Sequence, residues 1–122
     1  KGTFMENIAR YEALEYAESM QDVKAKLIAL RERVEAMVAH VENVSKESAQ
    51  FKDFHARRLV ESVGHIIITH LLAQQAAEVE TYGSDAKVFL KMAEQYIAGA
   101  EAVILNSTAE DVALWSAVQE EF

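Results

Sequence analysis

The feature that most constrains the fold is an apolar stretch near the middle of the chain, residues 59–79, which reads LVESVGHIIITHLLAQQAAEV. Its centre, from Val63 to Ala73, is apolar almost all the way round a helix, with Gly64 inside it. A helix that is hydrophobic on every side has to be buried by neighbours on every side. We therefore predict the central helix of an all-α, antiparallel (up-and-down) bundle of four to five helices. Glycine costs about 1 kcal/mol relative to alanine inside a helix, so we expect another helix to approach closely at Gly64.

Length and composition favour one helical bundle domain over residues 1–122. The chain has 122 residues, no proline and only four glycines, and 51% of its residues are hydrophobic. Proline breaks helix interiors and glycine weakens them, so this composition suits helices joined by short polar turns. The absence of cysteine excludes disulfides, thiolate nucleophiles and cysteine metal sites. The formal net charge of −8 argues against nucleic acid as a partner, because phosphate binding needs a basic face.

The apolar stretch does not predict a membrane span. Residues 63–73 contain two histidines and are far fewer than the roughly 20 residues that cross a bilayer. No secretory signal opens the chain, since it starts with Lys-Gly-Thr rather than with methionine and an apolar run. We expect a cytoplasmic protein without a membrane span. The start at Lys1 suggests a fragment of a longer protein, although cloning or processing could produce the same start.

Two segments precede the central helix. Residues 5–19 predict a first helix, and residues 1–20 are a candidate lead-in helix from an upstream domain. The next segment, Val23–Val44, places apolar residues in alternating steps of four and three, the a/d pattern of helix packing: Val23, Leu27, Leu30, Val34, Met37, Val41 and Val44. This seam predicts either a long helix of an intramolecular bundle or, in a free-standing bundle, a protein-interaction surface that binds a partner helix. The polar residues 45–48 are expected to end this helix, and Asp53 to be the N-cap of the central one.

Two turns are predicted after the central helix. Residues 82–85, with the sequence Tyr-Gly-Ser-Asp, predict the first turn, because Gly83 can end one helix there. Residues 106–108, with the sequence Asn-Ser-Thr, predict the second turn. At its end, Thr108 and Asp111 have the spacing of a capping box, so a last helix is expected to begin there.

The last helix and a basic pair supply the candidate contact residues. One stripe of the last helix carries Val112, Trp115, Val118 and Phe122. Trp115 and Phe122 are expected to dock this helix on the bundle or, alternatively, to form an exposed anchor for a partner domain. Arg57 and Arg58 end a segment, residues 23–58, with eight basic and five acidic residues and a net charge of +3. They are candidates for contact with an anion, whereas the alternative is a solvated basic segment that packs between acidic neighbours.

The chain shows no constellation typical of catalysis or metal binding. Its four histidines are His40, His55, His65 and His70. No carboxylate lies three residues from any of them, the spacing that di-iron bundles use, and only Glu61 and His65 pair at a spacing of four. We expect a hydrogen bond between Glu61 and His65, and buried, hydrogen-bonded roles for His65 and His70. We assign no catalytic, cofactor-binding or metal-binding residue.

Two segments of the chain resemble helices in the C-terminal extension of the acyl-CoA dehydrogenase family. Residues 57–68, RRLVESVGHIII, resemble one helix of that extension, and residues 85–93, DAKVFLKMA, resemble the next helix. The resemblance is best over residues 53–105, and it implies the C-terminal helical domain of a dehydrogenase-like protein. It implies a structural or assembly role without a catalytic site of its own. Because such an extension packs on the enzyme core or on a neighbouring subunit, a homo-oligomer is also implied.

The resemblance implies a chemistry only for the parent polypeptide. Acyl-CoA dehydrogenases bind FAD and desaturate an acyl-CoA between its α and β carbons. A glutamate removes the α proton, and a hydride passes to the flavin. None of the parts that hold this chemistry is recognisable in this chain. FAD and an acyl-CoA substrate are therefore implied for the parent enzyme, and no cofactor is implied for this chain.

Overall fold

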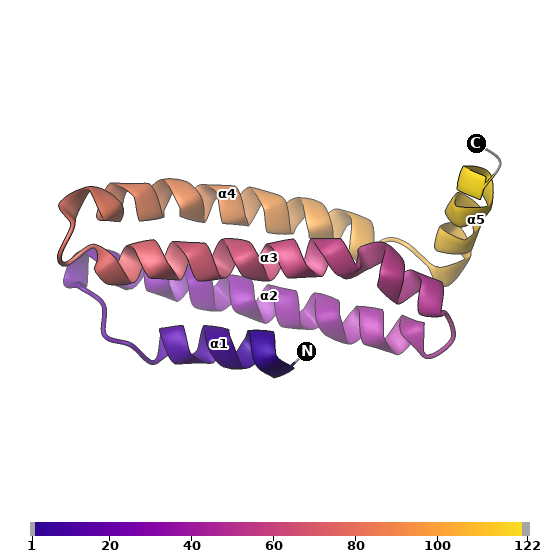
Figure 1. The fold of residues 1–122 in the computed structure, drawn as a ribbon, viewed down its shortest axis with the longest axis horizontal. Helices are drawn as coiled ribbons and strands as arrows, with labels where there is room; N and C mark the ends of the chain where they lie inside the picture. The colour runs from indigo at the N-terminus through magenta and orange to yellow at the C-terminus, as the bar shows by residue number, and fades with distance from the viewer. Residues whose placement is uncertain (1, 121–122) are drawn as a thin grey trace.

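A computed structural model describes residues 2–120, and within that range the chain forms five α-helices and no strand. The helices are α1 (Gly2–Glu12), α2 (Gln21–Ser45), α3 (Ala49–Gln75), α4 (Glu80–Ile104) and α5 (Ala109–Glu120), with a 3-10 turn at Glu18–Met20. Figure 1 shows α2, α3 and α4 side by side, the short α1 along one side of them, and α5 at one end. The prediction of an all-α helical bundle is confirmed.

Short connections make the long helices antiparallel neighbours. Residues 46–48 join α2 to α3, and residues 76–79 join α3 to α4. Connections of this length make consecutive helices antiparallel neighbours, because the chain has to turn back within a few residues. The resulting up-and-down path can be followed by colour in Figure 1.

The apolar seam of α2 forms the core of the bundle. Six of its seven residues are at most 2% exposed: Val23, Leu27, Leu30, Val34, Met37 and Val41. They are buried because α2 contacts both α3 and α4. The interpretation of Val23–Val44 as a surface that binds a partner helix is therefore wrong, and the intramolecular alternative is right.

The central position of α3 is confirmed, but its burial on every side is not. This helix contacts α1, α2, α4 and α5, and it buries Phe51, Val63 and Ile66 among them. On its outward face Val60 and Ile68 remain about half exposed. Helix α1 lies beside α3 without covering these two side chains.

Gly64 does not mark a close helix approach. A Cβ atom added at this position would meet no atom of the chain within 4 Å outside the local helix. The predicted approach of another helix is therefore wrong among the described residues. The glycine lies on the open face of α3 between Val60 and Ile68.

Two predicted boundaries are wrong. Ser48 is the N-cap of α3, because its side chain accepts a hydrogen bond from the backbone N–H of Phe51 at 3.3 Å, and Asp53 lies inside the helix. The predicted turn at residues 82–85 lies within α4, and the chain turns earlier, at residues 76–79. Gly83 instead faces the bundle, where an added Cβ would lie 3.4 Å from the methyl carbon of Met20.

The N-terminal region is a short helix followed by a fixed loop rather than one helix over residues 5–19. Helix α1 ends at Glu12, whose carboxylate accepts two hydrogen bonds from Arg31 at 3.0 and 3.1 Å. Lys24 donates to the backbone carbonyl of Leu14 at 3.0 Å and thereby holds the loop against α2. Helix α1 itself packs on the bundle through Ile8, which is fully buried.

The second predicted turn is confirmed. Residues 105–108 separate α4 from α5. The Thr108 hydroxyl accepts from the backbone N–H of Asp111 at 3.1 Å, and the Asp111 carboxylate accepts from the backbone N–H of Thr108 at 3.0 Å. This reciprocal pair is the predicted capping box, and it starts α5.

Candidate interaction surface

Helix α5 leaves most of its apolar residues exposed. Its sequence, AEDVALWSAVQE, spreads apolar residues around the whole helix rather than along one stripe. Val112 is buried, whereas Leu114 is 67% exposed, Trp115 47% and Val118 41%. A helix that is apolar all round needs neighbouring apolar surfaces on every side, and the described part of the chain does not supply them for α5.

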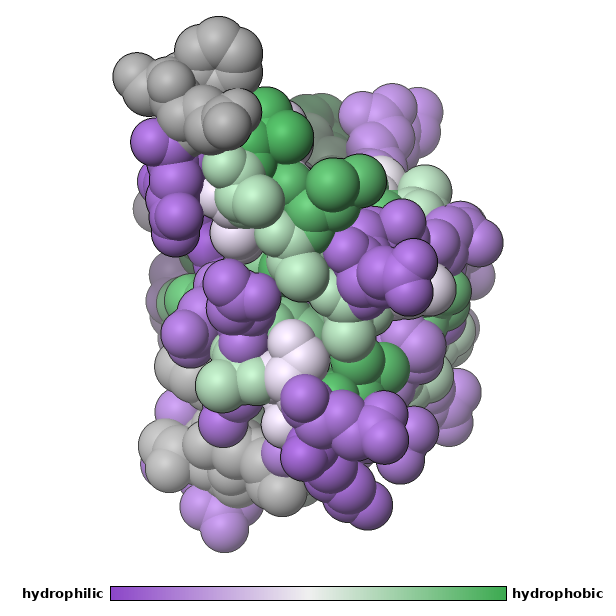
Figure 2. All heavy atoms as spheres, turned by 90° about the vertical axis from the view of Figure 1, so that its right-hand side faces the viewer, coloured by the Kyte–Doolittle hydropathy of each residue, from purple (hydrophilic) through white to green (hydrophobic). Residues whose placement is uncertain are grey.

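The predicted docking stripe of α5 is therefore only partly formed. Val112 docks the helix on the bundle, Trp115 is about half exposed, and Phe122 lies outside the described residues. The exposed position of Trp115 agrees with the alternative of an anchor for a partner domain. Figure 2 faces this end of the molecule and shows apolar side chains gathered in its upper part, where α5 lies.

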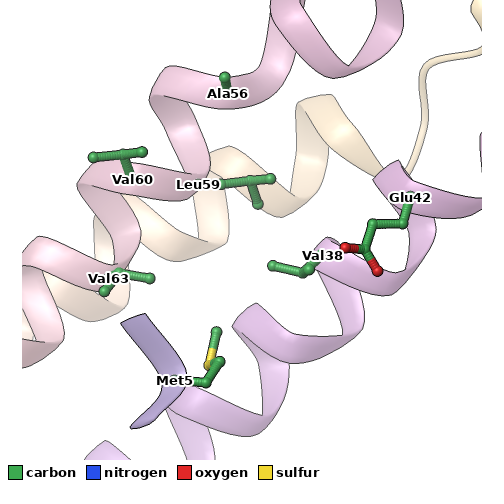
Figure 3. A pocket seen from close by; sticks show the side chains of 7 residues that line it. All are labelled: Met5, Val38, Glu42, Ala56, Leu59, Val60 and Val63. Carbon is green, nitrogen blue, oxygen red and sulfur yellow. The ribbon is translucent and has the colours of Figure 1, made fainter. Parts of the chain in front are cut away.

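A second apolar surface is a groove between α1, α2 and α3. It has a volume of about 170 Å³, and its lining comes from all three helices: Met5, Val38, Glu42, Ala56, Leu59, Val60 and Val63. Figure 3 shows the apolar side chains around this space, with Glu42 at one edge. Cofactor and ligand pockets usually enclose about 300–1,000 Å³. The groove is too small and too apolar to fit a flavin dinucleotide with its phosphates.

Arg57 and Arg58 do not converge on one point. Consecutive residues of a helix diverge by about 100°, and these two side chains have different partners. Arg57 donates to the Glu61 carboxylate at 3.0 Å and is 88% exposed. Arg58 lies 5.4 Å from the centre of the Phe54 ring and donates to the Phe54 carbonyl at 3.4 Å. Contact of this pair with an anion stays a prediction.

His65 makes a ring contact rather than the predicted hydrogen bond. Its ring centre lies 4.9 Å from that of Tyr96, and the side chain is partly exposed rather than buried. The Glu61 carboxylate accepts instead from the Tyr96 hydroxyl at 2.5 Å and from Arg57. These two hydrogen bonds, the one from Tyr96 foremost, lower the pKa of Glu61. The spacing of Glu61 and His65 within one helix cannot predict that Glu61 pairs with Tyr96 of α4.

His70 is buried, as predicted, and links α3 to the loop after α1. Its Nδ1 atom lies 2.7 Å from the Tyr16 hydroxyl, which also lies 3.0 Å from the Tyr11 carbonyl. A hydroxyl has one proton, so both hydrogen bonds form when Nδ1–H of His70 donates to Tyr16 and Tyr16 donates to the carbonyl. Burial lowers the pKa of His70 to about 4 and raises the pKa of Tyr16 to about 12. Both groups are therefore neutral at neutral pH.

His55 forms a similar link at the other end of α3. Its Nε2 atom lies 2.9 Å from the hydroxyl of Ser107, which donates to the Ile104 carbonyl at 3.3 Å. Burial lowers the pKa of His55. The hydrogen bond between His55 and Ser107 ties the α4–α5 turn to α3. Among the described residues, no group of three or more His, Asp or Glu side chains is placed to hold a metal ion.

Comparison with known proteins identifies the family of this fold. The family model for the C-terminal domain of acyl-CoA dehydrogenases matches residues 1–112, and the chain belongs to this family. A crystal structure of an acyl-CoA dehydrogenase family protein from Porphyromonas gingivalis is similar, with a TM-score of 0.78 and 27% sequence identity. The similarity covers 87% of this chain and 90% of that chain. A search of curated proteins finds no significant match.

The family match sets α5 apart from the rest of the fold. It ends at Val112, the buried residue of α5, and the more exposed residues Leu114, Trp115 and Val118 lie beyond it. Across the described residues, no helix has the length and apolar content that a bilayer span requires.

Proposed function

We propose that this chain is the C-terminal helical domain of an FAD-dependent acyl-CoA dehydrogenase-like protein and serves its assembly. In this role the bundle packs against the catalytic part of the parent polypeptide or against a neighbouring subunit, and the chain contributes no catalytic residue. We further propose that the parent is a cytoplasmic homo-oligomer that acts on an acyl-CoA. The family match and the similar solved structure support the domain assignment.

The observation that carries the assembly role is the exposed apolar surface of α5. Leu114, Trp115 and Val118 lie within two turns of one another, and each is at least two-fifths exposed. Burying a large apolar side chain contributes about 1.5–3 kcal/mol. Grouped exposed apolar residues on a soluble protein commonly mark a contact with another protein surface. A tryptophan flanked by aliphatic side chains is well suited to anchor such a contact.

The side chains present support the proposal that the redox chemistry lies in another part of the parent polypeptide. FAD would supply the hydride acceptor in the parent enzyme, and acyl-CoA desaturation would occur where that flavin is bound. The groove between α1, α2 and α3 does not fit the flavin, and its lining of six apolar side chains and one carboxylate offers no cation for its phosphates. The residues of this chain instead bury apolar helix surfaces and hold α5 at the end of the bundle.

The assembly role is tested in the parent enzyme with the double substitution L114E/W115E. Charged side chains in a buried contact are costly, so we expect the variant to dissociate or to lose its domain contact in sedimentation velocity. A matched control is V88E, because Val88 is 55% exposed and lies in the N-terminal half of α4, away from the end that leads into α5. Flavin absorbance per subunit is measured in the same samples, to check that the catalytic part of the parent still binds FAD.

Two results would overturn the proposal. Tight binding of FAD to the chain of residues 1–122, seen as a shift in flavin absorbance and a raised melting temperature, would place the chemistry within this chain. Unchanged assembly and unchanged domain contact in the L114E/W115E variant would remove the role of α5.

A further inference from the structure

A hollow between α3 and α4 lies close to the end of the bundle from which α5 extends. Its volume is about 280 Å³. It is lined by one residue of α3 and four of α4: Arg58, Gln95, Tyr96, Gly99 and Ala100. Gly99 lies within two turns of the end of α4, where the chain passes into α5 (Figure 1). The hollow and the start of α5 are therefore at the same end of the molecule.

The missing side chain of Gly99 helps to leave the hollow open. A Cβ atom added at Gly99 would meet no described atom within 4 Å outside the local helix. Glycine inside a helix costs about 1 kcal/mol relative to alanine, and no contact within the described chain requires it here. The volume falls just below the range of about 300–1,000 Å³ typical of ligand pockets. The hollow therefore suits one large side chain better than a cofactor.

Arg58 gives the hollow a cation that has no carboxylate partner among the described residues. Its guanidinium lies 5.4 Å from the centre of the Phe54 ring and donates to the Phe54 carbonyl at 3.4 Å, a long distance for a hydrogen bond. The nearby Glu61 carboxylate is already bound by Arg57 and Tyr96. Guanidinium groups stack on aromatic faces, and tryptophan is the best partner. The hollow therefore offers a planar cation to an aromatic side chain.

Helix α5 has the complementary features. It exposes Trp115, which is the only tryptophan of the chain. Its charged residues among those described are all acidic: Glu110, Asp111 and Glu120. Asp111 lies one turn before Trp115, on the same side of the helix. A Trp115 ring in the hollow would therefore bring a carboxylate close to Arg58.

We infer that Trp115 docks into the α3–α4 hollow of a second copy of this chain. Within one copy, α5 contacts α3 and buries Val112, yet Trp115 stays 47% exposed. Two copies that meet at this end around a twofold axis would exchange their α5 helices and fill both hollows, because a twofold interface makes each contact twice. This inference rests on the proposed function, which assigns α5 to assembly, and it adds the partner and the contact site.

Charge favours a second copy as the occupant. The chain has a formal net charge of −8, so most contacts between two copies would bring acidic surfaces together. Residues 23–58 are the exception, with eight basic and five acidic residues. The exchange places the acidic α5 against the basic end of this segment, at Arg57 and Arg58. Opposite charges across an interface select which surfaces meet.

Trp115 reports its own burial, because no other tryptophan contributes to the fluorescence of residues 1–122. The emission spectrum is recorded at protein concentrations from about 1 μM to about 1 mM, which cover dimers of moderate affinity. We expect the emission maximum to move to shorter wavelengths as the concentration rises. Sedimentation velocity on the same samples should show the monomer converting to a dimer over the same range.

The substitution Gly99→Leu fills the hollow of the second copy and leaves the fold intact, since the added side chain meets open space and leucine favours helix. We expect the concentration at half of the emission shift to rise about tenfold or more. Gly64→Leu is the matched control, because it makes the same change at an equally open position of α3 outside the hollow. It should alter that concentration by less than about twofold. Thermal melting followed by circular dichroism checks that both variants are folded.

Two results would overturn the inference. An emission maximum that stays constant over the whole concentration range would show that no second copy covers Trp115. A concentration-dependent shift that Gly99→Leu leaves unchanged would show that the second copy covers Trp115 with another surface.

The parent protein separates this inference from the proposed function. Sedimentation velocity compares its Gly99→Leu, Gly64→Leu and L114E/W115E variants. If L114E/W115E disrupts assembly and Gly99→Leu does not, α5 keeps its assembly role and the hollow is rejected as its partner. If residues 1–122 form dimers that depend on Gly99 while the parent binds no flavin, the docking contact is retained and the proposed function is rejected.

Discussion

Helices α2 and α5 are both rich in apolar residues, yet the bundle buries one set and leaves the other exposed. On α2 the apolar residues follow one side in steps of four and three, and α3 and α4 bury all of them except Val44, which is partly exposed. On α5 they surround the helix, and only Val112 is buried. One stripe can be covered by two neighbouring helices, whereas a helix that is apolar all round needs cover on every side.

The difference distinguishes residues that hold the fold from residues that are free to make an assembly contact. The α2 seam, represented by Leu27 and Met37, is committed to the interior of the bundle. The exposed residues of α5, represented by Leu114 and Trp115, lie beyond the part of the chain that the family match covers. Substitutions should therefore have different consequences in the two helices: loss of folding in α2 and loss of assembly in α5.

The largest predicted effect comes from removing the same side chain in the two helices. Leu27→Ala should lower the free energy of unfolding by about 2–5 kcal/mol, because Leu27 is fully buried and its loss leaves a cavity. Leu114→Ala should change it by less than about 0.5 kcal/mol, because that side chain is mostly exposed. Urea unfolding of residues 1–122, followed by circular dichroism at neutral pH, measures both values.

The pair of variants has a clear contrary outcome. If Leu114→Ala destabilised the chain as much as Leu27→Ala, α5 would be an integral part of the core, and the distinction between the two helices would fail. The slope of the free energy against urea concentration serves as the control, because equal slopes show that both variants unfold the same surface.

The second prediction concerns acid, which acts on the core and not on the exposed surface of α5. His70 is buried and its pKa is lowered to about 4, from 6.5. The unfolded chain therefore binds a proton at a higher pH than the folded chain does. The stability linked to this group is complete above pH 6.5 and falls as the pH drops toward 4. The loss amounts to roughly 3 kcal/mol over that range.

The acid effect is measured as the free energy of unfolding at several pH values between 7 and 4.5. Glutamates also titrate toward the lower end of that range, so the effect of His70 is assigned by comparison with a variant at that position. The variant H70Q removes the titrating ring but keeps a side chain that can donate to Tyr16, so its profile should be flatter. Some slope should remain, because burial also lowers the pKa of His55. Identical slopes for H70Q and the unsubstituted chain would contradict the assignment.

The sequence predicts those features whose cause lies within a few neighbouring residues. The spacing of the α2 seam predicts which of its residues are buried. The Thr108–Asp111 capping box is a local exchange of hydrogen bonds. The family resemblance rests on helix patterns of the same local kind, and the family match confirms it.

Features that depend on distant residues cannot be predicted from local sequence patterns. The link between Tyr16 and His70 joins residues 54 apart, and the link between Glu61 and Tyr96 joins residues 35 apart. No spacing rule within one helix could identify either pair. Composition failed at the α3–α4 connection as well, because residues 76–79 contain no glycine or proline and the N-cap, Val79, has no side-chain hydrogen bond. The sequence therefore predicts the turn at Gly83, whereas the chain turns at residues 76–79.

The smallest predicted effect compares the N-caps of a core helix and of α5. Ser48→Ala removes the cap of α3 and should cost about 1 kcal/mol of global stability. Thr108→Ala removes the cap of α5, and we expect no global loss, because α5 is docked mainly by Val112 and can unfold while the bundle stays folded. Instead, amide hydrogen exchange in residues 112–118 should quicken about fivefold, with exchange in α2 unchanged. If Thr108→Ala lowered the unfolding free energy as much as Ser48→Ala, α5 would fold as one unit with the bundle, and its exposed apolar face would then be presented on a rigid support.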